Sequence, residues 1–118
     1  MARILVIDDD PDIATTLGIA LQMAGHDVVL AADGRQGMEK QRARPADLVI
    51  TDLFMPEQEG LETIRELRKD FPEVPIIAMS GADVGNTMLT IASKMGAAKI
   101  LRKPFDVAEL MNAIEEVL

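Results

Sequence analysis

The chain predicts an α/β fold in which five parallel strands form one doubly wound sheet with five helices. Short runs rich in Ile, Val and Leu alternate with segments whose apolar residues recur at helical spacing, which is typical of successive βαβ units. Four of the runs, over 4–7, 48–51, 76–79 and 100–102, are followed at once by Asp, Asp, Ser and Lys. Because the carboxyl ends of parallel strands share one edge of a sheet, we expect these polar residues to meet there.

The first strand and the first helix are the clearest elements. Strand 4–7 is followed by Asp10, which can cap a helix, and by Pro11, which suits its first turn, while Gly25 can end it. The face expected to be buried contains Ile13, Leu17, Ala20, Leu21 and Ala24. A short strand over 28–31 follows. A second helix with little apolar surface then begins at Asp33 and ends before Pro45, because the residue preceding proline disfavours helix.

The second half of the chain continues the alternation. Strand 48–51 leads through a loop over 55–60 into a helix whose predicted buried residues are Leu61, Ile64, Leu67 and Phe71. Strand 76–79 precedes a fourth helix, with predicted buried residues Val84, Met88, Ile91, Ala92 and Met95. Strand 100–102 precedes a fifth helix capped by Asp106, and Glu109 completes a capping box. Its predicted inward residues are Val107, Leu110, Met111, Ile114 and Leu118.

The order of the strands follows from their composition and from the handedness of crossovers. Strand 28–31 is the least apolar, so it is expected at an edge of the sheet. Right-handed crossovers with helices on both faces then favour the order 2-1-3-4-5. In that order a ligand crevice lies at the switch point between the first and third strands, where Asp8, Asp9 and Asp52 are placed.

Length and composition limit the classes of function. The 118 residues suit one domain, predicted over 1–118. Twenty acidic residues against twelve basic ones give a net charge of −8, which disfavours direct binding to nucleic acid or to an anionic membrane. No run approaches membrane length, and the first residues lack the features of a signal peptide. The absence of cysteine excludes disulfides and thiol catalysis and fits the cytoplasm, where we expect the protein.

The polar residues at the predicted edge suit magnesium and phosphoryl chemistry. Two carboxylates at about 4 Å repel each other by roughly 4 kcal/mol, and a divalent cation removes that repulsion. Magnesium prefers one or two carboxylates plus water and phosphate oxygens, which matches Asp9 and Asp52 with Asp8 acting through water. Asp52 could also attack phosphorus. The Ser80 hydroxyl and the Lys103 ammonium would neutralise charge on the transferred group.

Each of these residues taken alone has an ordinary structural interpretation. The run Asp8-Asp9-Asp10 is most often a solvated loop with a helix cap, and Asp10 is interpreted as that cap. The alternating residues Asp8, Asp10 and Asp12 also resemble the start of a calcium loop. That interpretation is rejected because Ile13 stands where glycine is needed and Ile19 where glutamate is needed. The combination of polar residues at four strand ends is what indicates a functional site.

The residues at the strand ends resemble a known family, the receiver domain of two-component response regulators. The likeness extends over the whole chain, in order and at receiver-like separations. It rests on Ile7-Asp8-Asp9-Asp10, on Asp52 followed by Met55-Pro56 and Gly60, on Met79-Ser80-Gly81, and on Lys103-Pro104-Phe105. The resemblance implies a flavodoxin-like fold and a signalling domain that turns over no separate substrate.

The resemblance also implies a role for each matching residue. Asp52 would accept a phosphoryl group from a phosphohistidine of a sensor histidine kinase or phosphotransfer protein. Asp8, Asp9 and Asp52, with the backbone carbonyl of Phe54, would hold Mg²⁺. Ser80 would hydrogen-bond the phosphoryl group, and Lys103 would pair with it, placed by a cis Lys103–Pro104 peptide. The surface around the fourth helix and fifth strand would then switch, to control an output domain or a downstream protein.

One residue departs from the common receiver pattern, and two others bear on the lifetime of the phosphoryl group. Ile100 stands where many receivers carry a switching Tyr or Phe, so the usual aromatic swing is not expected in that form. Phe54 and Ala82 flank the site with apolar groups that offer no help in orienting a hydrolytic water, which predicts a fairly long-lived phosphoryl group.

Two other classes of protein remain as alternatives. A small Mg²⁺-dependent aspartyl-phosphate hydrolase of the haloacid dehalogenase type would make Asp8 the nucleophile and Asp10 the acid. Such a hydrolase is expected to have Thr or Val at position 12, where this chain has Asp. A chain of 118 residues also leaves little room for a cap and a substrate pocket. A pseudo-receiver would keep the fold as a binding module without acceptor chemistry, and the intact set of polar residues argues against it.

Overall fold

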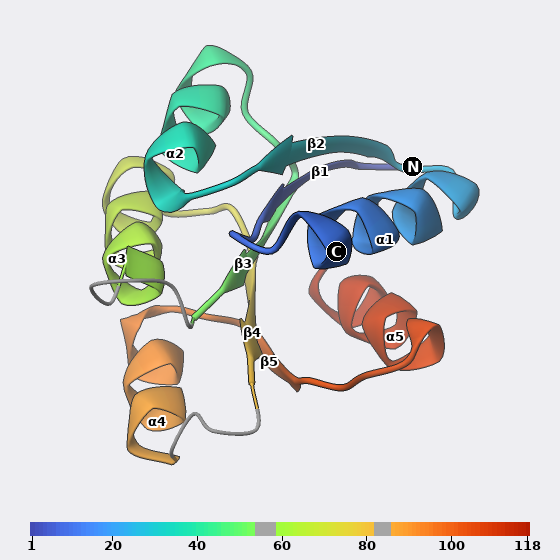
Figure 1. Ribbon diagram of the computed structural model, residues 1–118. Helices are drawn as coiled ribbons and strands as arrows, with labels where there is room; N and C mark the ends of the chain where they lie inside the picture. The colour runs from blue at the N-terminus through green and yellow to red at the C-terminus, as the bar shows by residue number, and fades with distance from the viewer. Residues whose placement is uncertain (54–58, 82–85) are drawn as a thin grey trace.

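The computed structural model describes residues 1–53, 59–81 and 86–118, in which strands and helices alternate along the chain (Figure 1). The elements are β1 (Arg3–Ile7), α1 (Pro11–Met23), β2 (Asp27–Ala31), α2 (Gly34–Ala43), β3 (Leu48–Asp52), α3 (Glu59–Asp70), β4 (Ile76–Ser80), α4 (Asn86–Met95), β5 (Lys99–Arg102) and α5 (Val107–Val117). None of the helices in these ranges is both long enough and apolar enough to cross a membrane.

The five strands form one parallel sheet in the order β2-β1-β3-β4-β5, which confirms the predicted fold class and strand order. Figure 1 shows α1 and α5 on one face of this sheet and α2, α3 and α4 on the other. The reversal of strand order falls between β1 and β3, so the carboxyl ends of these strands open a crevice between the two helix layers.

Successive side chains along each strand point to opposite faces of the sheet, so the core has two parts, one on each face. Leu5, Ile7, Val49, Ile76 and Ala78 pack under α2, α3 and α4. Their strand neighbours pack under α1 and α5; they are Ile4, Val6, Leu48, Ile50, Ile77, Met79 and Leu101. The central strands are therefore buried on both faces, which explains why their sequences are continuous apolar runs rather than alternating ones.

Helix ends follow the capping residues that the sequence contains. The Asp10 carboxylate accepts hydrogen bonds from the backbone N–H groups of Asp12 at 2.9 Å and Ile13 at 3.4 Å, which confirms its interpretation as a cap. Asp106 caps α5 in the same way, through the N–H of Glu109 at 2.8 Å. Gly25, with φ of 94°, ends α1 in a conformation that favours glycine.

Several predicted core positions on the helices were wrong. Val107 and Leu118 on α5 are 57% and 56% exposed, and Ile91 on α4 is 41% exposed. Ala24, at the end of α1, is also exposed. Helical spacing marks one face of a helix, whereas burial also requires the sheet to extend beneath that turn. The fully buried residues of α5 are Leu110, Ala113 and Ile114, while Met111 and Val117 are only partly buried against the core. Val84 and the side chain of Met88 lie outside the described residues.

Candidate functional site

The carboxyl edge of the sheet brings together the polar residues that follow β1 and β5 and those that end β3 and β4. Asp52 is the last residue of β3 and Ser80 the last of β4, each one position later than the predicted strand end. Asp8 follows β1, and Lys103 follows β5. Asp8, Asp52 and Ser80 are buried, with exposed fractions of 1%, 4% and 0%. These groups are therefore held away from bulk water, where their mutual interactions are strongest.

Three carboxylates form a group that could hold a cation. One oxygen each from Asp8, Asp9 and Asp52 lies within 4.8 Å of the others, and Asp9 is exposed while Asp8 and Asp52 are buried. The backbone N–H of Asp10 donates to Asp8 Oδ1 at 2.9 Å, which orients that carboxylate. An all-oxygen set with one open side fits Mg²⁺, which keeps water and phosphate oxygens among its ligands. Phe54, whose carbonyl is a further predicted ligand, lies outside the described residues.

Lys103 lies between the two buried carboxylates. Its Nζ is 3.2 Å from Asp8 Oδ2 and 3.2 Å from Asp52 Oδ2. Burial by itself would lower the pKa of Lys103. The charges of Asp52 and Asp8, and the hydrogen bonds to both, outweigh burial and raise the pKa above the usual value for lysine. The lysine therefore carries a full positive charge at neutral pH beside Asp52.

The hydroxyl of Ser80 is buried and has no hydrogen-bond partner within the described parts of the chain. The backbone of Ser80 is nevertheless well held, because its carbonyl accepts from the N–H of Lys103 at 2.7 Å. A buried hydroxyl without a partner costs free energy unless a ligand or water satisfies it. This side chain is therefore available to an oxygen-rich group placed at the strand ends.

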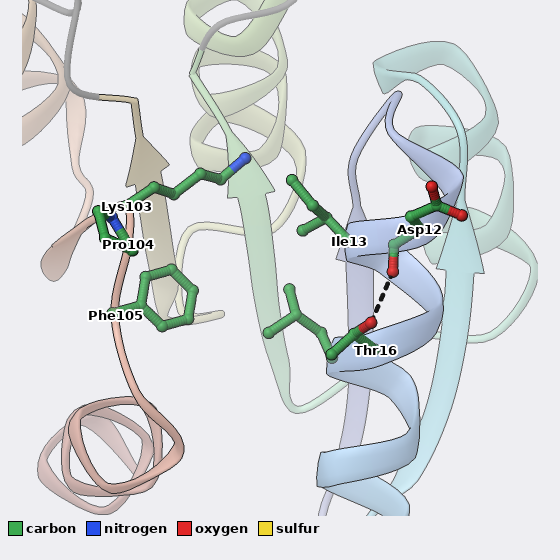
Figure 2. Close-up of a pocket in the computed structure, with 7 residues that line it drawn as sticks. Asp12, Ile13, Thr16, Lys103, Pro104 and Phe105 are labelled. Atoms are coloured by element: carbon green, nitrogen blue, oxygen red, sulfur yellow. Dashed lines mark hydrogen bonds between the residues drawn. The ribbon is translucent and has the colours of Figure 1, made fainter.

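The Lys103–Pro104 peptide is cis, as the resemblance implied. Beyond it, residues 103–105 face α1 across a groove of about 470 Å³, shown in Figure 2. Ile13, Thr16 and Leu17 line the α1 side, where the Thr16 hydroxyl donates to the Asp12 carbonyl at 2.8 Å. The ring of Phe105 faces α1 in this view, and Lys103 extends away from it toward the strand ends. The groove thus adjoins the carboxylate group and shares Lys103 with it.

Gly60 has a role at the site that was predicted only in part. A Cβ atom on Gly60, in the first turn of α3, would lie 2.5 Å from the carbonyl oxygen of Asp52 and 2.7 Å from the Cα of Leu53. Both contacts are with backbone, which cannot move aside as a side chain can. Glycine at this position lets α3 begin directly against the end of β3 and so helps to fix Asp52. We expected Gly60 in a loop over 55–60, but α3 begins at Glu59, so that part of the prediction was wrong. Glycine is otherwise unfavourable in a helix, and here the close approach to β3 requires it.

Ile100, at the position of the predicted switch, is half-buried on β5. It lies opposite Ala78 of β4 and packs against the core under α2, α3 and α4. Ile100 therefore connects β5 with the helix layer that contains α4, and β5 pairs with β4, which ends at Ser80. Met55 and Ala82, which the sequence placed beside the site, lie outside the described residues.

Several known proteins are similar to this chain in sequence, in structure or in both. A family model for the response regulator receiver domain matches residues 4–115. The DNA-binding transcriptional regulator NtrC of Rhizobium meliloti strain 1021 is 38% identical over 119 residues, which cover 99% of this chain and 24% of NtrC. Transcriptional regulatory protein ZraR of Klebsiella oxytoca is 37% identical over 98% of this chain. The chain thus spans about a quarter of the length of these relatives.

Solved structures agree with the sequence relatives. The chemotaxis protein CheY4 of Vibrio cholerae superposes with a TM-score of 0.92 at 30% identity, covering 100% of this chain and 99% of that one. NtrX of Brucella abortus, in complex with ADP, gives a TM-score of 0.93 at 29% identity, covering 99% of this chain and 27% of that one. The same fold therefore occurs both as nearly a whole chain and as one part of a longer one.

Proposed function

The chain belongs to the response regulator receiver domain family, and we propose from this premise that Asp52 accepts a phosphoryl group from a phosphohistidine. The donor would be a sensor histidine kinase or a phosphotransfer protein. We propose further that residues 1–118 act as one receiver domain, controlling an output domain or a downstream protein.

The observation that carries this proposal is the placement of Lys103 between Asp8 and Asp52, at 3.2 Å from each. A carboxylate is a weak nucleophile toward a dianionic phosphoryl group, because like charges repel. A partly buried ammonium beside it lowers that repulsion and stabilises charge on the phosphoryl oxygens as the transfer proceeds.

In the proposed transfer an Asp52 carboxylate oxygen forms a bond to phosphorus while the bond from phosphorus to the imidazole nitrogen breaks. The electron pair of that bond stays on the imidazole, which leaves the donor histidine unphosphorylated. Asp8, Asp9 and Asp52 would hold Mg²⁺ with the Phe54 carbonyl, and the bound cation would neutralise phosphoryl charge. The Ser80 hydroxyl, which has no partner among the described residues, would donate to a phosphoryl oxygen.

Access for the donor is supported by the groove between α1 and residues 103–105. It opens beside Lys103, and its lining is largely apolar, with Ile13, Leu17 and Phe105. Two further apolar side chains on α1 are exposed: Ile19 by 54% and Met23 by 85%. A protein that delivers a phosphohistidine to Asp52 would cover this groove, because the groove shares Lys103 with the acceptor site.

The output would arise on the side of α4 and β5. Phosphorylation replaces the single charge of Asp52 by roughly −2 and adds three acceptor oxygens, which would draw the Ser80 hydroxyl toward them. Ser80 ends β4, and its neighbour β5 contains Ile100, which packs into the layer with α4. A shift at Ser80 would therefore reach α4 through aliphatic repacking, without an aromatic side chain.

Acetyl phosphate with Mg²⁺, followed by intact mass measurement, tests the proposal. We expect one phosphoryl adduct on the wild type and on Asp10→Asn, which changes only a helix cap, and none on Asp52→Asn. An adduct that persists on Asp52→Asn would refute the assignment of the acceptor. Failure of the wild type to form an adduct would favour a binding module. Steady hydrolysis of p-nitrophenyl phosphate that is abolished by Asp8→Asn would favour the hydrolase.

A further inference from the structure

Helix α2 lies against the sheet with little side-chain bulk between them. Its buried residues are Gly34, Gly37, Met38 and Gln41, and of these only Met38 has a large apolar side chain. A surface helix usually packs on its core through a stripe of large apolar side chains. The position of α2 therefore needs another explanation.

Gly37 provides that explanation, because it allows the side chain of Ile7 to lie directly against the backbone of α2. A Cβ atom on Gly37 would lie 2.4 Å from Ile7 Cδ1 and 2.8 Å from Ile7 Cγ1. Ile7 is the last residue of β1 and is completely buried, so it has no solvent space to turn into. A methyl group at position 37 would therefore displace either Ile7 at the end of β1 or α2 itself.

A displacement of Ile7 reaches the acceptor site through the chain itself. Ile7 is bonded to Asp8, which is followed by Asp9, and these two residues supply two of the three clustered carboxylates. The side chain of Ile7 is thus the nearest packed support of both carboxylates along β1.

A displacement of α2 reaches the same carboxylates through hydrogen bonds. Gln36 lies next to Gly37 in the first turn of α2, and its Oε1 accepts from the backbone N–H of Ala32 at 3.1 Å. The carbonyl of the preceding residue, Ala31, accepts from the backbone N–H of Asp8 at 3.1 Å. The start of α2 is therefore tied to Asp8 through the end of β2.

A groove beside the carboxylates would change with either displacement. It has a volume of about 340 Å³ and lies between the start of α1 and the end of β2. Asp8 and Asp9 line it, and α2 contributes Gln36 to its wall. Asp9 is the exposed member of the carboxylate group, so the open side of that group faces space whose width depends on α2.

We propose that Gly37 is a positioning residue for the Mg²⁺ site, because it holds Asp8 and Asp9 where their oxygens can share one cation. It does so by letting α2 approach Ile7. This inference rests on the proposed binding of Mg²⁺ by the carboxylates. Gly60 makes a similar close approach at the end of β3, so two helical glycines contact the two strand ends that supply the carboxylates.

Calorimetric titration with MgCl₂ tests the inference, with Gly37→Ala as the variant and Gly18→Ala as its matched control. Both substitutions replace a buried helical glycine, and alanine is favourable inside a helix, so both variants should fold. A Cβ on Gly18 would make only ordinary contacts, the nearest at 3.4 Å from Leu30 Cδ2. We expect Gly37→Ala to bind Mg²⁺ about tenfold more weakly than the wild type, which is typical of residues that orient metal ligands. Gly18→Ala should bind it as the wild type does.

A second substitution tests whether the effect passes through Ile7. Ile7→Val removes Cδ1, the atom closest to the added methyl group. The double variant Gly37→Ala/Ile7→Val should therefore bind Mg²⁺ more tightly than Gly37→Ala, and the two substitutions should be non-additive. A glycine with only a structural role would change the urea midpoint without changing the Mg²⁺ affinity of the folded protein.

A measurement without Mg²⁺ separates this inference from the proposed function. In EDTA the backbone amide signals of Asp8 and Asp9 in nuclear magnetic resonance spectra should shift in Gly37→Ala and stay in place in Gly18→Ala. A wild type that binds no Mg²⁺ would refute the proposed metal site, and the amide signals would then decide whether Gly37 positions the carboxylates. A wild type and a Gly37→Ala variant that bind Mg²⁺ equally well would leave the metal site standing and overturn the role of Gly37. Signals of Asp8 and Asp9 that do not shift in Gly37→Ala would overturn it as well.

Discussion

Replacing Lys103 by methionine removes the positive charge between Asp8 and Asp52 while keeping a side chain of similar length. At 3.2 Å each ion pair corresponds to about 5 kcal/mol of attraction at an effective dielectric constant near 20. Desolvation of the lysine offsets much of this, since burial is the largest single influence on its pKa. Removing one partner of a buried pair typically costs about 3–5 kcal/mol. Because the Lys103 side chain is 21% exposed, we expect the lower end of that range, about 3 kcal/mol.

Urea unfolding of Lys103→Met, measured once with excess EDTA and once with excess MgCl₂, gives the relevant free energies of unfolding. Without Mg²⁺ the variant should lose about 3 kcal/mol, because two buried carboxylates then repel each other without a compensating cation. Mg²⁺ should restore much of that loss, since a divalent ion held by the carboxylates replaces the missing charge.

The matched control for this experiment is Lys69→Met, which removes an exposed lysine of α3. It should stay within about 0.5 kcal/mol of the wild type under both conditions. A loss of less than about 1 kcal/mol for Lys103→Met in EDTA would mean that Lys103 behaves as an ordinary surface ion pair, which contradicts the prediction. A loss of about 3 kcal/mol that is the same with and without Mg²⁺ would also contradict the prediction, because the carboxylates would then not bind the cation.

Three further outcomes follow from the same structure. Asp10→Ala should lower the free energy of unfolding by about 1 kcal/mol in urea, through loss of the α1 cap, and should still form the acetyl phosphate adduct. Gly60→Ala should cost about 1–3 kcal/mol and slow adduct formation, because its Cβ would press on the Asp52 backbone; wild-type stability would contradict the close approach. Ser80→Ala should leave unfolding in urea unchanged or slightly improved, since it removes an unpartnered hydroxyl. Its adduct should form more slowly than that of the wild type, and equal rates would remove Ser80 from the proposed transfer.

Much of the fold could be predicted because it depends on local rules. Asp10 caps α1 for reasons contained in neighbouring residues, and Gly25 ends that helix because its φ is positive. The strand order followed from the low apolar content of β2 and from the handedness of crossovers. Burial on the helices was less predictable. Ile91 and Val107 lie at the helical spacing of core residues, yet both are exposed. Whether such a residue is buried depends on how far the sheet extends under its helix.

The fold class, the strand order and the polar residues at the carboxyl edge could all be predicted from the sequence, because hydrophobic period, helix caps and strand ends act over a few residues. The folded chain was needed to show that Lys103 contacts residues 95 and 51 positions away and that Gly60 lies against the end of β3. It was also needed to show that one donor of Gln41 has no partner among the described residues. Distances between segments far apart in the sequence depend on how the whole core packs, so they cannot be predicted from local sequence patterns.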